Sequence, residues 1–395
     1  MKVLHIASFS GNIGDNLSHI GFENILARFG SEYVIDKLEI RKFYNNYDGV
    51  DKRCFDRSFI KKMNDYDIVF VGGGGFFDYW VEGSASGTTI NMDAEMVAEI
   101  NVPTIFSSIG CHPHRTVPPG NEEKFRRFFQ ALTKNCNILI GLRNDGSIKV
   151  LESIFPDEMA TWENVYEILD NGFFYETGER EADYTSRLID TPYVAINITD
   201  DQLSMISSRR EKIETERYLT SLVKYVNNIS DQYHVVFVPH IYSDLKAIYS
   251  VLEKLDQSVV RNKVTVSPCI QGDIGTRLNF SVYANSELVI ASRFHANVGP
   301  LALGRKVIGL AVLDRVAYMY DSIAKTKQYI DVNTEFSSEL LEKSQEMILL
   351  PYNNPGLLNE KIGCTLDFYR KALSLTEVSS HKKCTDQRHT EFREE

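Results

Sequence analysis

The stretch SELVIASRFHANVGPLALGRKVIGL, residues 286–310, sets the fold class of this chain. An apolar, β-branched run at 288–291 is followed by a polar turn, by an apolar segment that ends in Gly304, and by a second apolar run at 307–310. Parallel neighbouring strands need a crossover connection, which is usually a helix. The stretch therefore predicts two strands of a parallel sheet joined by a short helix after His295.

The same alternation of short apolar runs and helical-period segments continues on both sides of this stretch. It predicts an α/β fold with parallel sheets and helices on both faces. The expected strands are 3–9, 67–71, 103–107, 138–143, 193–198, 235–239, 264–267, 288–291 and 307–310, and the expected helices are 17–29, 122–134, 145–155, 216–229 and 244–255.

The length of 395 residues favours two domains, each with its own core. A weakly patterned stretch near 171–191, rich in Glu, Asp, Gly and Thr, is the expected boundary. We therefore expect an N-terminal domain over 1–180, a C-terminal domain over 181–375 with a late helix at 357–373, and a polar, disordered tail over 376–395.

Composition and charge exclude several functional classes. With 43% hydrophobic and 25% charged residues the chain is expected to be globular, and its net charge of −11 argues against a nucleic-acid partner. The six cysteines are scattered without a CxxC pair, so neither a zinc cluster nor a disulfide framework is indicated. No metal and no cofactor are expected.

The chain opens with MKVLHIASFS, which has the pattern of a strand rather than of a signal sequence. No apolar run approaches the roughly 20 residues that a membrane-spanning helix needs. A cytoplasmic location is therefore expected, with peripheral membrane contact only if a substrate is lipid-linked.

The polar turn within 286–310 carries the strongest candidate site. Arg293 and His295 follow a strand end, where open α/β sheets bind ligands and helix N-termini attract anions. If the strand geometry continued through them, both side chains would project to the same side. Arginine can bind a carboxylate or phosphate through its forked donors, and histidine can carry a proton near neutral pH. The alternative is a surface arginine and a core histidine.

A second candidate is VFVGGGGFFDYW, residues 69–80. Glycines such as Gly73 and Gly74 allow a close approach of a ligand to the backbone, and Asp78 beside Trp80 places a carboxylate next to an aromatic ring suited to a sugar. The sequence is neither a dinucleotide fingerprint nor a Walker loop. A tight turn and a helix-capping Asp78 are the alternatives.

Three further strand ends carry polar residues. GNIGDNL at 11–17 places Asp15 and Asn16 in a loop that can line a site, although either residue can be a helix N-cap. Arg143 in LRNDGSIKVL lies where a second anion contact is expected. IGCHPH contains His112 and His114, which can bind a metal only with a third ligand that the spacing does not supply.

Four of these motifs together resemble the polysaccharide pyruvyl transferase family. They are GNIGD at 11–15, VFVGGGG with Asp78, LRNDGS at 142–147 and the segment 286–310, and the resemblance spans residues 5 to 315 in order. The resemblance implies two Rossmann-like domains facing a cleft, as in glycosyltransferases of the B type. It also implies transfer of a pyruvyl group from phosphoenolpyruvate to sugar hydroxyls, which forms a ketal and releases phosphate.

The resemblance also implies roles for individual residues. Arg293 and His295 would bind phosphoenolpyruvate and supply the acid, Arg143 would make a second anion contact, and Asp78 would serve the sugar or oligosaccharide acceptor. The sequence departs from the family pattern at Arg315, where a lysine is frequent, and at Asp170-Asn171, where an aspartate-proline pair is usual.

Two other functions stay open at this point. A nucleotide-sugar glycosyltransferase could use the same scaffold, with Arg293 against a diphosphate, because fold does not determine chemistry. A non-catalytic carbohydrate-binding relative is the other. Binding of UDP or GDP without binding of phosphoenolpyruvate would favour the glycosyltransferase.

Overall fold

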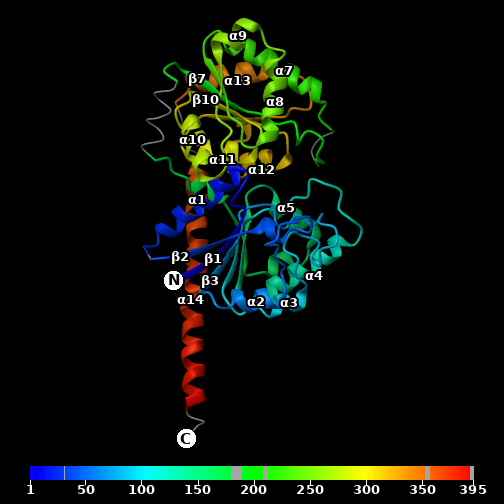
Figure 1. Cartoon of the computed structure of the whole chain (residues 1–395), viewed down its shortest axis with the longest axis vertical. Coiled ribbons are helices and arrows are strands. Elements are labelled where there is room, and N and C mark those ends of the chain that lie inside the picture. The colour runs from blue at the N-terminus through cyan, green and yellow to red at the C-terminus, as the bar shows by residue number, and fades with distance from the viewer. Residues whose placement is uncertain (31, 179–188, 208–211, 352–355, 392–395) are drawn as a thin grey trace. The chain divides into compact units, whose positions relative to one another are not determined.

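The computed structural model of the chain describes residues 1–30, 32–178, 189–207, 212–351 and 356–391 (Figure 1), with side chains as far as Glu377. The chain divides into two units. The first unit comprises Met1–Ser8, Ile25–Leu169 and Lys361–Glu395, and the second comprises Phe9–Asn24 and Asp170–Glu360. Among the described residues, no helix is long and apolar enough to cross a membrane.

The first unit is built on a six-stranded parallel sheet in the order β2-β1-β3-β4-β5-β6. Its central strands are apolar on both faces and fully buried, as is typical of a parallel sheet that helices cover on both sides. The strands are β1 (Lys2–Ala7), β2 (Val34–Glu39), β3 (Ile68–Val71), β4 (Thr104–Ile109), β5 (Ile138–Arg143) and β6 (Val165–Ile168).

Helices of the first unit begin at side chains that cap their free N–H groups. Asp56 accepts a hydrogen bond from the backbone N–H of Phe59 and begins α2, and Asp93 accepts from Met96 and begins α3. The apolar face of α4 buries Phe125, Phe128 and Phe129 against the sheet. The helical segments are η1 (Ile40–Phe43), α2 (Arg57–Met63), α3 (Ala94–Ala98), α4 (Asn121–Lys134), α5 (Ser147–Ile154) and η2 (Met159–Thr161).

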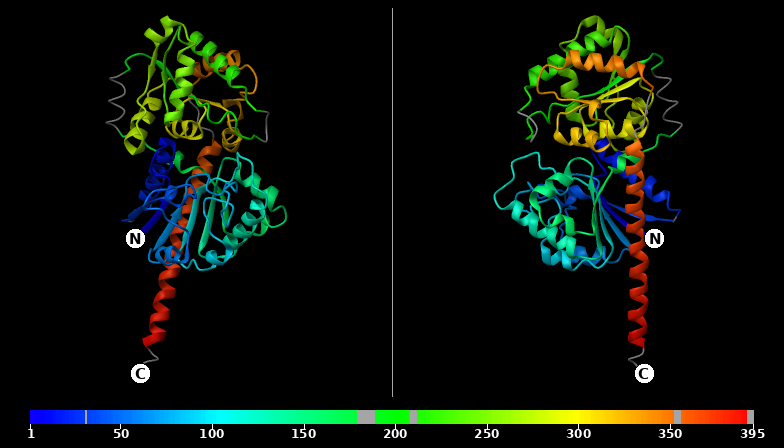
Figure 2. Two further views of the ribbon diagram at one scale, coloured as in Figure 1. Left: turned by 45° about the vertical axis from the view of Figure 1, so that its right-hand side comes forward. Right: turned by 180° about the vertical axis from the view of Figure 1, so that it is seen from behind.

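The C-terminal helix α14 (Gly356–Glu391) contributes its part from Lys361 onward to the first unit (Figures 1 and 2). The Tyr369 ring lies 6.0 Å from that of Phe70 on β3, and its hydroxyl hydrogen-bonds to Ser107 on β4. This helix differs from the disordered tail expected over 376–395, because it continues to Glu391. Residues 392–395 lie outside the described residues.

The second unit contains a second six-stranded parallel sheet, in the order β12-β11-β10-β7-β8-β9. The chain passes from β10 through a helix to β11, which pairs in parallel with β10, as the sequence predicts. The strands are β7 (Tyr193–Asn197), β8 (His234–Phe237), β9 (Val264–Val266), β10 (Leu288–Ala291), β11 (Val307–Leu310) and β12 (Tyr329–Ile330).

The helices of the second unit cover this sheet, and α13 packs beside α7 on one side of it (Figure 2). Most of α1 belongs to this unit, since residues 9–24 make their contacts there. The helical segments are α1 (Ile13–Ala27), η3 (Asn171–Phe174), α7 (Thr215–Ile229), α8 (Tyr242–Leu252), α9 (Gln257–Lys263), α10 (Gly272–Ala284), α11 (Phe294–Ala302), α12 (Asp314–Ser322), η4 (Thr326–Gln328) and α13 (Ser337–Leu349).

The division of the chain differs from the predicted domains in three places. The units change between Leu169 and Asp170 rather than between 180 and 181, and residues 9–24 belong to the second unit. Residues 361–375 belong to the first unit instead of the second. The reason is that the first sheet is complete at β6, and that α14 packs on that sheet. Residues 179–188 of the expected boundary lie outside the described residues.

Candidate active site

The turn after β10 holds Arg293 and His295 in helical rather than strand geometry. The strand ends at Ala291, Arg293 is the N-cap residue of α11 with φ −77° and ψ 144°, and His295 is the second residue of that helix. The expectation that strand geometry places both side chains on one side is therefore wrong. Each side chain instead has its own carboxylate partner.

Arg293 is buried, and most of its guanidinium is bound within the second unit. Nε lies 2.8 and 2.9 Å from the two carboxylate oxygens of Asp244, and Nη2 donates to Thr199 at 3.0 Å and to Asp201 at 3.1 Å. Burial acts to lower the pKa of Arg293, but Asp244 and Asp201 outweigh it and raise that pKa. Within the described residues Nη1 donates no hydrogen bond, so it is the nitrogen left for a ligand.

Asp244 also fixes the start of α8. Its fully buried carboxylate accepts hydrogen bonds from the backbone N–H of His240 at 2.9 Å and of Ile241 at 3.4 Å. The His240 ring is buried and lies 2.9 Å from the Tyr283 hydroxyl through Nε2. Burial, together with the nearby Arg293 and His295, holds the pKa of His240 well below its usual value. This ring is therefore neutral at neutral pH.

His295 is held by a different, fully buried carboxylate. Its Nε2 lies 3.3 Å from Oδ2 of Asp170, whose Oδ1 accepts from the backbone N–H of Gly172 at 2.7 Å. The other ring nitrogen, Nδ1, has no hydrogen-bond partner within the described part of the chain. The side chain keeps 9% of its surface exposed. Asp170 thus orients the ring, as a carboxylate does beside a catalytic histidine.

The N-terminus of α1 packs directly on His295. A Cβ on Gly14 would lie 2.7 Å from Cβ and 2.8 Å from Nδ1 of His295, so only glycine fits without moving the ring. The helix is capped by Asn12, whose Oδ1 accepts from the backbone N–H of Gly14 at 2.9 Å. Asp15 and Asn16, which the sequence offers as caps, lie inside the first turn instead.

Asn16 belongs to a further cluster on the same helix. Its Nδ2 donates to Asp273 on α10 at 2.8 Å, and Nε2 of the buried His19 lies 2.9 Å from the same carboxylate. The N-termini of α1, α8, α10 and α11 therefore converge within the second unit. The backbone N–H of Ile13 donates to the carbonyl of His240 at 3.4 Å, and the Thr276 hydroxyl lies 3.2 Å from the carbonyl of Ile13. Helix N-termini carry partial positive charge, so this region favours an anionic ligand.

The other predicted residues belong to the first unit, beginning with the glycine turn after β3. Gly72 has φ +135°, and a Cβ there would lie 1.9 Å from the carbonyl oxygen of Ser107. The predicted close approach in this turn is thus made by the backbone of β4. Asp78 is nearly buried, and its Oδ1 accepts from the backbone N–H of His112 at 2.6 Å. It caps no helix.

Arg143 ends β5 as predicted, and its charge is compensated inside the unit. Nε lies 2.7 Å and Nη2 2.6 Å from Oδ2 of Asp145, and both side chains are buried. Cys111 lies nearby, and burial raises the pKa of its thiol well above the usual value, with Asp78 and Asp145 adding to that effect.

His112 and His114 stack with their ring centroids 4.7 Å apart, and Trp80 has the guanidinium of Arg115 4.6 Å above its ring. The described residues contain no group of three or more His, Cys, Asp or Glu side chains that could hold a metal. Arg315 lies on the first turn of α12 in the second unit, partly buried.

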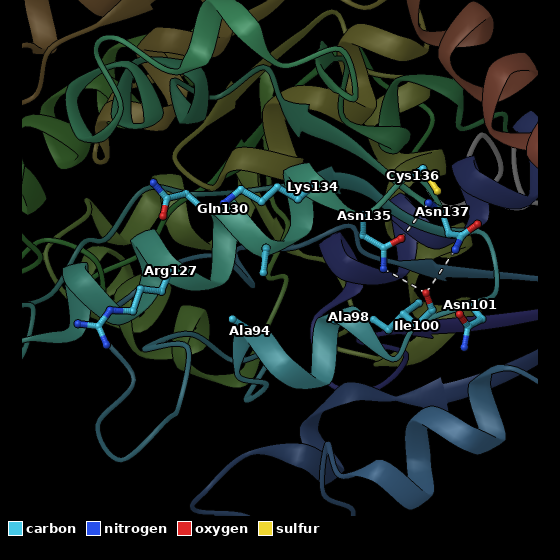
Figure 3. Close-up of a pocket in the computed structure, with 11 residues that line it drawn as sticks. Ala94, Ala98, Ile100, Asn101, Arg127, Gln130, Lys134, Asn135, Cys136 and Asn137 are labelled. Carbon is cyan, nitrogen blue, oxygen red and sulfur yellow. Dashed lines mark hydrogen bonds between the residues drawn. The ribbon is translucent and has the colours of Figure 1, made fainter.

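A pocket of about 600 Å³ lies between α3 and α4 of the first unit (Figure 3). The Asn135 and Asn137 amides that line it already donate to the carbonyl of Ile100. None of the predicted site residues lines this pocket.

The sequence pointed to Arg143, Arg293 and His295 but not to the interactions that position Arg293 and His295. Asp201, Asp244 and Gly14 were not singled out, and Asp170 was named only as a departure from the family pattern. Asp170 could have been found, because it stands at the position of the family's usual aspartate-proline pair. Asp201 and Asp244 follow β7 and β8, and a search for carboxylates after every strand would have found them.

Comparison with solved structures shows the fold. UDP-GlcNAc 2-epimerase from Methanocaldococcus jannaschii superposes with a TM-score of 0.53 at 13% identity, covering 93% of this chain and all of that one. The 2-epimerase from Neisseria meningitidis bound to UDP-GlcNAc gives 0.52 at 11% identity, covering 93% and 99%. A glycosyltransferase from Rickettsia africae gives 0.50 at 12% identity, covering 94% and 98%. The fold is therefore that of two Rossmann-like domains, as in glycosyltransferases of the B type.

Sequence comparison shows the family. No curated protein matches the chain significantly. The family model of polysaccharide pyruvyl transferases matches residues 12–315, which is most of the chain and includes residues 12–15 of the GNIGD loop, Arg143 and the turn with Arg293 and His295. This chain belongs to the polysaccharide pyruvyl transferase family and is a transferase that acts on polysaccharide.

Proposed function

We propose that the chain transfers the pyruvyl group of phosphoenolpyruvate to two hydroxyls of a saccharide, closing a cyclic ketal and releasing phosphate. The observation that carries the proposal is the geometry of His295. One ring nitrogen is tied to the buried Asp170, and the other lies beside Gly14 where helix N-termini converge. His295 is a proton donor in a region that favours anions. Such a site suits an anionic substrate that must receive a proton on carbon during the reaction.

The first step is transfer of a proton from His295 to the methylene carbon of phosphoenolpyruvate. The carbon–carbon double bond supplies the electron pair, and C2 becomes an oxocarbenium-like centre. Asp170 keeps the ring oriented during the transfer. The guanidinium of Arg293 and the N-termini of α1 and α11 hold the donor's anionic groups.

A sugar hydroxyl then attacks C2 and loses its proton. The C2–phosphate bond breaks with departure of phosphate, and a neighbouring hydroxyl attacks C2 to close the ketal. Of the two hydroxyl protons, one returns to the neutral His295 and the other leaves with phosphate. No electrons are lost or gained, so the reaction needs no redox cofactor.

Asp78 is proposed as the base that first takes the proton of the attacking hydroxyl and then passes it to the departing phosphate, and Arg143 as a further anion contact. Asp78→Asn tests the first role, because an amide oxygen can still accept the His112 N–H while the basic carboxylate is removed. We expect a fall in kcat of roughly a hundredfold with an unchanged melting temperature. An unchanged kcat would remove Asp78 from the reaction.

The experiment that tests the function is phosphate release from phosphoenolpyruvate across a panel of β-galactosides, mannosides and lipid-linked sugars. We expect release that depends on one acceptor class, and His295→Gln should lower it roughly a hundredfold or more. Thermal stabilisation by UDP but not by phosphoenolpyruvate would instead indicate a nucleotide-sugar glycosyltransferase. We place the enzyme in the cytoplasm, which cell fractionation tests.

A further inference from the structure

Arg293 has two carboxylate partners that differ strongly in their surroundings. Asp244 is fully buried, meets Nε with both oxygens, and also accepts two backbone N–H groups at the start of α8. The side chain of Asp201 is 36% exposed and meets only Nη2, at 3.1 and 3.2 Å. Asp244 is thus a structural partner of the guanidinium, which it also contacts at Nη2 at 2.5 Å, whereas Asp201 is a partly exposed partner of Nη2 alone.

The charged side chains of this group already carry a net negative charge, so an added anion is repelled as long as Asp201 stays in place. One guanidinium and two carboxylates sum to −1, and Asp201 is ionised at neutral pH. Burial acts to raise its pKa, but the Arg293 guanidinium and hydrogen bonds from Thr199, Arg293 and Ser243 hold that pKa below its usual value. A doubly anionic donor at Arg293 would meet this carboxylate as a like charge.

The hydrogen bonds that hold the Asp201 carboxylate can pass to a ligand. Its carboxylate is held by the hydroxyls of Thr199 and Ser243 and by Nη2, all of them side-chain donors. Those three donors point at a position where a carboxylate already sits. A carboxylate or phosphate group of a ligand needs the same donors in the same place.

We propose that Asp201 is an internal competitor for the donor, occupying with its carboxylate the place that an anionic group of the donor takes on Nη2 of Arg293. This rests on the proposed function only for the identity of the donor. Asp201 leaves the guanidinium when the donor binds, and the donor then receives the hydrogen bonds of Arg293, Thr199 and Ser243. The residue therefore sets donor affinity and takes no part in the proton transfer at His295.

Asp201→Asn tests the proposal, since it keeps the shape and removes the competing charge. Inorganic phosphate is the first probe, measured by calorimetry at fixed ionic strength. We expect roughly two- to fivefold tighter phosphate binding than in the wild type, the size expected for loss of one partly exposed ion pair. Asp200→Asn is the matched control, because Asp200 pairs with Lys246 rather than with Arg293, and it should bind phosphate as the wild type does.

Steady-state kinetics with phosphoenolpyruvate give the second readout. In Asp201→Asn the KM for phosphoenolpyruvate should fall by the same factor while kcat stays within about twofold. A loss of kcat with unchanged KM would make Asp201 a participant in the chemistry and overturn the inference. The inference would also be overturned if Asp201→Asn bound phosphate as tightly as the wild type or more weakly, or if neither protein bound phosphate.

The two proposals fail separately. If the wild type releases phosphate from phosphoenolpyruvate and Asp201→Asn does not change phosphate affinity, the role of Asp201 as a competitor is wrong and the proposed function is retained. If Asp201→Asn binds phosphate more tightly and no acceptor supports phosphate release, the role of Asp201 is retained and the donor is a different anion.

Discussion

At the scale of single residues, Asp170 gives His295 its proposed role. In Asp170→Asn the amide oxygen can still accept the Gly172 N–H, but the negative charge beside Nε2 is lost. We expect kcat for phosphate release to fall at least roughly tenfold, with little change in the KM for phosphoenolpyruvate. Asp256→Asn, at the exposed start of α9, is the control and should leave both constants unchanged. Equal kcat in the two variants would contradict the role of Asp170.

Asp244 is predicted to contribute to the stability of the fold. Asp244→Asn leaves the buried guanidinium of Arg293 with only the partly exposed Asp201 as a charged partner. Removing one partner of a buried ion pair costs about 3 kcal/mol of unfolding free energy or more. Denaturant unfolding measures this loss. Lys254→Ala breaks the exposed Lys254–Glu216 pair and should cost less than about 1 kcal/mol, so similar losses in both would refute the assignment.

His240 predicts how stability depends on pH. Because burial lowers its pKa in the folded state, the unfolded chain binds the proton first as the pH falls. The stability contributed by the neutral ring is fully present above the ordinary histidine pKa of about 6.5 and is lost below it, by up to about 1.4 kcal/mol per pH unit. His240→Asn should flatten the fall in unfolding free energy between pH 6.5 and 5. Parallel curves for both proteins would show that this ring titrates normally.

At the scale of elements, the packing of α1 on α11 depends on a missing side chain. Gly14→Ala would bring a Cβ within 2.8 Å of His295 Nδ1, so the ring has to move away from its position against Asp170. We expect a fall in kcat of roughly tenfold or more, measured as phosphate release. Gly363→Ala is the control, because a Cβ there meets no atom within 4 Å, and it should stabilise α14 by up to about 1 kcal/mol. Full activity of Gly14→Ala would disprove the contact.

The elements that the sequence predicted best are the buried ones. The strands expected at 138–143, 288–291 and 307–310 have those bounds in the structure, because a run of apolar residues is buried on both faces. The missed strands are short or half-exposed. β2 reads VIDKLE with three charged residues and little burial, and β12 has two residues, so neither presents the apolar run of a central strand.

The candidate site could also be predicted only in part from the sequence. Arg143, Arg293 and His295 were found because arginine and histidine directly after a strand stand out in the sequence. The partners of Arg293 and His295 could not be read from spacing, since Asp170 is 125 positions from His295 and Asp244 is 49 from Arg293. Only the tertiary fold of the second unit brings these residues together. The sequence therefore predicts charged groups at the strand ends but not which of them neutralise each other.

At the scale of the whole molecule, the chain leaves the first unit near Leu169 and returns to it through α14. Tyr369 is fully buried against Phe70 of β3, so this late helix completes the core of the first unit. Tyr369→Ala should lower its unfolding free energy by about 3–5 kcal/mol, measured by thermal or denaturant unfolding. Arg370→Ala, on the exposed side of the same turn, should change it by less than about 0.5 kcal/mol. Equal effects would mean that α14 does not pack as described.

The proposed reaction depends on transfer of a proton from His295 to the methylene carbon of phosphoenolpyruvate. Mass spectrometry of the saccharide product formed in D₂O detects this transfer. We expect a ketal whose methyl group carries one deuterium, formed by the wild type and reduced roughly a hundredfold in His295→Gln. A product whose pyruvyl group contains no deuterium, or equal product from both proteins, would contradict it.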